Sequence, residues 1–121
     1  MDISKYKEQL QETVIAPMME FMEECDDVDE CGYSESAVSE CEELISEYLD
    51  ELGDLDDPTD GEIMELVRMV VMGINELCEK TDYCMIDTME REAIWEIIQN
   101  SAVECGLSDP SDDITEEWRD W

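Results

Sequence analysis

Carboxylates are the abundant reactive side chains of this sequence, because 37 of the 121 residues are Asp or Glu, against 6 Lys or Arg and no His. Paired carboxylates can act as general acid and base or bind a cation, but nothing distinguishes one pair among so many. Histidine, the commonest general base and metal ligand, is absent. There is also no glycine-rich phosphate loop and no Gly-x-Ser-x-Gly motif. The sequence predicts a protein that is not an enzyme and needs no cofactor, and a metal hydrolase built from carboxylates alone is the remaining catalytic alternative.

One acidic segment resembles a calcium-binding loop. Over residues 56–67, Gly61 stands at position 6 of an EF-hand loop. Position 12, where such a loop needs a bidentate Glu, is Val67. The segment therefore does not predict a calcium site, and Thr59 and Glu62 fit better as a capping box that begins a helix.

The six cysteines predict no metal or redox site. No Cys-x-x-Cys pair occurs, so the spacing of zinc ribbons and thioredoxin-like motifs is missing. Cys41, Cys78 and Cys105 lie on apolar helical stripes, which favours a role as small core residues. No signal peptide is visible and the longest apolar stretch, 66–74, is short and contains Arg68. We therefore expect a cytoplasmic protein with reduced thiols.

The charge is unevenly distributed along the chain. The 60 residues between Lys7 and Arg68 contain 22 Asp or Glu and no Lys or Arg. An ordinary helical surface interleaves both signs, whereas a field of one sign favours steering or recognition. A formal charge of −31 excludes direct binding to nucleic acid or to anionic membranes, since both need Lys and Arg. The predicted partner is a basic protein. Plain solvation, halophilic adaptation and weak, unspecific cation binding remain alternatives.

The apolar residues predict a folded, all-α chain. They make up 43% of the sequence and recur at three- and four-residue steps. Pro17 predicts a kink near Thr13 or two separate helices. Gly53 is expected to end a helix in the left-handed conformation, and Gly106 is expected to stop another helix. The expected helices cover residues 4–24, 36–52, 59–79, 87–105 and a short stretch after Pro110.

Together these helices predict one acidic domain over residues 1–121, a compact bundle of four to six helices. The helix near 60–79 is apolar nearly all round, so it is expected at the centre of the bundle. Met64, Met69 and Met72 are therefore expected to pack in the core, although methionines can also form an adaptable binding groove. Trp95 is likewise expected in the core, with Trp118 and Trp121 docking the C-terminal tail; Trp and Tyr are also common interface anchors.

In length, charge and helical character the chain resembles acidic inhibitors that mimic DNA, among them phage anti-restriction and anti-CRISPR proteins and the immunity proteins of nuclease toxins. The C-terminal half also resembles an uncharacterised family of small bacterial helical proteins, through Glu90-Arg91-Glu92, Cys105-Gly106-Leu107 and the closing Arg119-Asp120-Trp121. Neither resemblance implies a functional residue, but the first implies competition with nucleic acid for a basic surface.

The residues therefore predict an acidic inhibitor that binds the nucleic-acid-binding surface of a nuclease or of a CRISPR or restriction effector. The alternative is a helical adaptor, or an immunity protein, whose acidity mainly serves solubility. The oligomeric state stays open. The carboxylates expected to bind the partner lie on the first two helices and in the loops after them: Glu23, Glu24, Asp26, Asp27, Asp29, Glu30, Glu40, Glu43, Glu47, Asp54, Asp56 and Asp57.

Overall fold

A computed structural model describes residues 2–24, 34–81, 86, 88–108, 110, 113–119 and 121. These residues form an all-α fold with no strand in the described part of the chain. Its elements are, in order, α1 (Ile3–Leu10), the π-helical turn η1 (Gln11–Ile15), α2 (Ala16–Glu24), α4 (Glu35–Asp54), α5 (Asp60–Lys80) and α6 (Thr88–Cys105). The predicted all-α bundle is confirmed.

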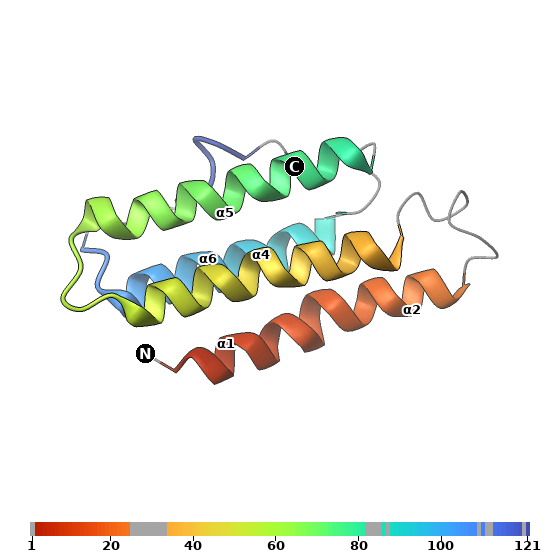
Figure 1. The fold of residues 1–121 in the computed structure, drawn as a ribbon, viewed down its shortest axis with the longest axis horizontal. Coiled ribbons are helices and arrows are strands. Elements are labelled where there is room, and N and C mark those ends of the chain that lie inside the picture. The colour runs from red at the N-terminus through yellow and green to blue at the C-terminus, as the bar shows by residue number, and fades with distance from the viewer. Residues whose placement is uncertain are drawn as a thin grey trace.

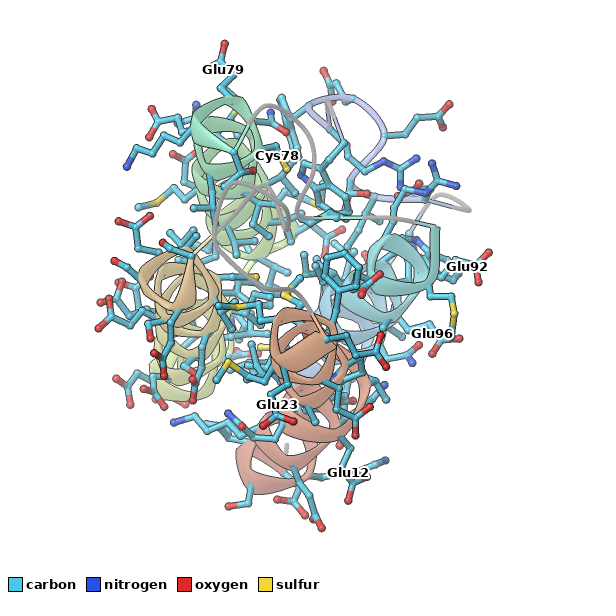
Figure 2. All side chains as sticks on the ribbon, turned by 90° about the vertical axis from the view of Figure 1, so that its right-hand side faces the viewer. Glu12, Glu23, Cys78, Glu79, Glu92 and Glu96 are labelled. Atoms are coloured by element: carbon cyan, nitrogen blue, oxygen red, sulfur yellow. The ribbon has the colours of Figure 1, made fainter. Side chains whose placement is uncertain are left out.

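Four rods run antiparallel to their neighbours along the chain (Figure 1). The first rod is α1, η1 and α2 end to end, and α4, α5 and α6 are the others. Seen along the helices, α4 and α6 lie on opposite sides, with α5 above them and the first rod below (Figure 2). Both α4 and α6 contact α5 and α1, and they also contact each other.

The helix at 60–80 is therefore not the centre of the bundle, and that expectation is wrong. The neighbours of α5 are α4 and α6, and its Met69 and Met72 are 54% and 44% exposed. The helix with neighbours on most sides is α4, which packs against α1, α2, α5 and α6. The amphipathic sequence of α4 supplies one deeply buried stripe, which ends in Tyr48, Leu49 and Leu52.

The first rod does not break at Pro17. Because Pro17 has no amide N–H, the carbonyl of Thr13 cannot receive the usual α-helical hydrogen bond. The chain widens into η1 just before the proline, and the N–H of Ala16 donates to the carbonyl of Gln11. The α-helical pattern is therefore interrupted at 11–15, around Thr13, and helical turns continue through the proline.

Capping residues explain where α5 begins and α6 ends. The Thr59 hydroxyl accepts a hydrogen bond from the N–H of Glu62 at 3.2 Å, which is one of the two bonds of the predicted capping box. The Glu62 carboxylate accepts from the Thr59 hydroxyl at 3.4 Å. At the other end, Gly106 has a φ of 122°. Its N–H donates to the carbonyl of Val103 and the N–H of Leu107 to that of Ala102, the pattern of a Schellman motif.

Two other predicted helix ends are wrong. Gly53 lies inside α4, and the left-handed residue after this helix is Asp57, with a φ of 49°. A Cβ at Gly53 would lie 1.9 Å from Cδ1 of Ile3, so this glycine admits the start of α1. The described residues after Pro110 form hydrogen-bonded turns at 114–118 and no regular helix. A side-chain hydrogen bond holds this tail against α5, because Asn75 Nδ2 donates to the Trp118 carbonyl at 2.7 Å.

Candidate protein-binding groove

The outer face of α4 carries a line of carboxylates. The helix is capped by Ser34, whose hydroxyl accepts a hydrogen bond from the N–H of Ala37 at 3.3 Å. Burying one side of this helix turns the remaining positions outward, and acidic side chains gather there (Figure 2). Residues three and four apart share a helix face, which aligns Glu40, Glu43, Glu47 and Glu51. We call these four residues the α4 carboxylate stripe.

Most of the stripe forms no ion pair within the described residues. Glu40 lies 3.8 Å from Lys80 Nζ, in an exposed ion pair between α4 and α5. In the described part of the chain, no Lys or Arg forms an ion pair with Glu43, Glu47 or Glu51. The other side of α4 differs, because Lys7 pairs there with Asp50 at 2.7 Å.

A groove runs beside the stripe, between α4 and α5. It consists of two adjoining hollows of about 190 and 100 Å³, and both are lined by Leu44 and Glu47. We call it the α4–α5 groove, and the lining residues used below are Glu40, Glu43, Leu44, Glu47, Glu51, Leu66, Met69, Gly73, Glu76 and Lys80.

Gly73 shapes the floor of this groove. A Cβ at Gly73 would lie 2.8 Å from Cδ2 of Leu44, closer than carbon atoms approach without a shift. The glycine therefore lets Leu44 of α4 lie directly against the α5 backbone. The result is a groove with an apolar floor and a wall of carboxylates.

The exposed methionines are residues whose position was predicted wrongly. Met69 and Met72 were expected in the core, but both face outward from α5. Met69 lines the α4–α5 groove, whereas Met72 does not. Met64, the third of these residues, is partly buried against the core.

The predicted partner-binding residues do not all meet at one place. Glu40, Glu43 and Glu47 line the groove together. Glu23 and Glu24 are exposed at the end of α2, and Asp54, Asp56 and Asp57 are exposed where α4 ends and the connection to α5 follows. The remaining four, Asp26, Asp27, Asp29 and Glu30, lie outside the described residues.

A second acidic hollow, of about 390 Å³, lies between the first rod and α6. It is lined by Glu12 of η1 and by Glu92 and Glu96 of α6, which Figure 2 labels on that side of the bundle. Met89 also lines it and is 78% exposed. The sequence did not single out this place, because its two walls are some 80 residues apart in the chain.

The described cysteines and tryptophans are mainly structural. Cys41 and Cys78 are buried, and burial raises the pKa of the Cys41 thiol to about 12, with a smaller contribution from Cys78. Cys105 is partly buried, and burial raises its pKa as well. Trp118 and Trp121 pack against the core as expected, but Trp95 is only partly buried.

These features define an all-α protein with a groove that is acidic along one wall and apolar at its floor. Within the described residues, no group of three or more Cys, Asp or Glu side chains has an arrangement that could hold a metal ion. None of the described helices combines the length and the apolarity that a bilayer span requires. No family model, no curated protein and no solved structure matches the chain.

Proposed function

We propose that the protein is a non-catalytic acidic inhibitor, acting in the cytoplasm of a bacterium or of a phage-infected cell. Its target is the basic nucleic-acid-binding surface of a nuclease or of a CRISPR or restriction effector. The observation that carries the proposal is the α4 carboxylate stripe, in which Glu43, Glu47 and Glu51 have no cationic partner among the described residues.

The spacing of the stripe suits this role. Its neighbouring carboxylates are three or four residues apart, which is about 4.5–6 Å along a helix axis. Lys and Arg that hold phosphates can pair with such a line through charge-assisted hydrogen bonds. The partner's cations are already placed for phosphate, so binding needs little rearrangement. The charge of −31 also speeds encounter with a basic partner and makes association sensitive to salt.

The second candidate function is a helical adaptor, or an immunity protein that binds through apolar contacts. Met69 favours it, because a methionine that is 54% exposed beside Leu44 offers an adaptable apolar contact. In that case the carboxylates would serve solubility, and binding would depend weakly on salt.

A pull-down from bacterial lysate, repeated with DNA or RNA as competitor, tests the first proposal. We expect a basic nucleic-acid-binding protein that nucleic acid displaces, and weaker capture as salt rises. Capture of a partner that nucleic acid leaves in place would contradict mimicry and favour the adaptor. The matched control is the variant with Glu40, Glu43 and Glu47 changed to Gln, which keeps side-chain size and removes three charges.

A further inference from the structure

We infer that the α4–α5 groove receives one amphipathic helix of the basic partner, with Lys or Arg along one edge of its apolar face. This inference rests on the proposed function only in requiring a basic partner, and it adds the form in which that partner is recognised.

The length of the groove fits a helix of a few turns. Glu40 and Glu51 mark its extent along α4, and the eleven residue steps between them span about 16 Å of helix axis. That distance is about three helical turns, enough for apolar side chains at positions i, i+4 and i+7 of a bound helix. Helices laid into such grooves are recognised by side chains of this spacing.

The walls of the groove are chemically unequal. The α4 wall presents Glu43, Glu47 and Glu51. The α5 wall presents Leu66 and Met69 beside Glu47 and Glu51, whereas Gly73 and Glu76 lie in the hollow that Glu43 lines. A bound helix therefore needs an apolar face against α5 and cations at its edge beside α4. A helix with cations on every side would leave Met69 in contact with charged groups.

The groove also excludes other occupants. Nucleic acid would place phosphates beside the α4 carboxylate stripe, and the two would repel each other. A peptide that binds as an added strand needs the edge of a sheet, and the described part of this chain has no strand. The cation near one end, Lys80, already lies 3.8 Å from Glu40 and leaves the rest of the stripe for the partner.

Three labelled peptides test the inference by fluorescence anisotropy with the full chain at about 0.15 M salt. The first, of about 18 residues, places leucines on one helical face and lysines along one edge of that face. The second has the same composition in scrambled order, and the third is an oligolysine of equal charge. We expect the amphipathic peptide to bind about tenfold more tightly than its scrambled isomer, because only the former buries apolar surface in the groove.

Two methionine variants locate the binding site. Met69→Gln should weaken the amphipathic peptide about five- to tenfold and leave oligolysine unaffected. Met72→Gln is the matched control, since Met72 is exposed on the same helix but does not line the groove. Circular dichroism should show equal helicity for both variants, because neither side chain is buried.

Equal binding of all three peptides, or equal effects of the two methionine variants, would overturn the inference. Neither result would contradict the proposed function, which requires only the negative charge of the α4 carboxylate stripe. Conversely, selective binding of the amphipathic peptide together with a natural partner that nucleic acid cannot displace would support the groove and refute the mimicry.

Discussion

Carboxylates are paired with a cation in the C-terminal tail and left without an ion pair on most of the outer face of α4, among the described residues. In the tail, the Arg119 guanidinium lies 2.7 Å from the Asp113 carboxylate and 5.5 Å from the centre of the Trp121 ring. Both charged side chains are only about a fifth exposed. On α4, Glu43 and Glu47 face the groove with no ion pair among the described residues.

The two regions differ in how far their carboxylates are removed from water. Arg119 neutralises a carboxylate that the tail takes partly out of water, where an unpaired charge is costly. The α4 carboxylate stripe stays in water, where lack of a partner costs little in stability. Uncompensated charge on α4 is therefore compatible with a stable fold and available for binding, and the following predictions test that contrast.

The largest expected effect is the loss of partner binding when Glu40, Glu43 and Glu47 are all changed to Lys. Close interfacial charge pairs couple strongly, so we expect at least about 100-fold weaker binding, mainly through slower association. The melting temperature should stay the same or rise, because the change relieves repulsion. Surface plasmon resonance at two salt concentrations measures the rates, and unchanged affinity would refute a role for the stripe.

In the tail, Arg119→Ala should change stability and not binding. It removes the hydrogen bond to Asp113 and the contact with Trp121, and we expect a loss of about 1–3 kcal/mol in the free energy of unfolding. Arg68→Ala is the control, because the Arg68–Glu65 pair is exposed and should contribute much less to the free energy of unfolding. Urea unfolding measures both, and equal losses would show that partial burial does not make the Arg119–Asp113 pair more stabilising than an exposed pair.

Salt should stabilise the protein through the repulsion that its carboxylates exert on one another. We expect the melting temperature to rise by several degrees between low salt and about 0.5 M NaCl, as screening shortens the range of that repulsion. The triple Lys variant should show a smaller rise, since its net charge is less negative. A melting temperature that falls with salt would mean that internal ion pairs outweigh the repulsion.

The smallest effect concerns one carboxylate at the start of α5. Asp60 accepts hydrogen bonds from the N–H and the hydroxyl of Ser108 at 3.1 and 2.6 Å, and these hold its pKa below the ordinary value. A lowered pKa in the folded state contributes stability above the unfolded pKa, and that contribution is lost as pH falls through the folded value. The stability difference between wild type and Asp60→Asn should therefore shrink below about pH 4, as thermal melts across pH would show.

Much of the fold could be predicted because local signals agreed with the packing. The buried apolar side of α4, the helix cap at Thr59 and the helix end at Gly106 each depend on residues a few positions apart. The alignment of Glu40, Glu43 and Glu47 follows from helix period alone. The groove beside them could not be predicted in this way, because α5 supplies its other wall.

The error about α5 came from counting its apolar residues without placing them. Met69 is four residues after Glu65, and Met72 is four residues after Arg68, so each shares a face with a charged residue. That spacing places both methionines on the polar side of the helix, where they are exposed. The helix predicted after Pro110 does not form for a different reason. Hydrogen bonds with the side chains of α5 and α6 hold residues 113–119 in turns, and a sequence pattern within the tail does not reveal those contacts.

The π-helical turn η1 keeps the first rod in phase with the bundle. The buried residues Tyr6, Leu10, Val14 and Met18 follow one another at steps of four, and each such step overshoots a full α-helical turn by about 40°. In a uniform helix the later residues would rotate away from the core. The wider turn rotates the chain less per residue and returns Met18 to the core side. Deleting a single residue from 11–15 would leave eleven steps between Tyr6 and Met18, only about 20° more than three α-helical turns, so a uniform α-helix without the π-helical turn should then hold both residues in the core.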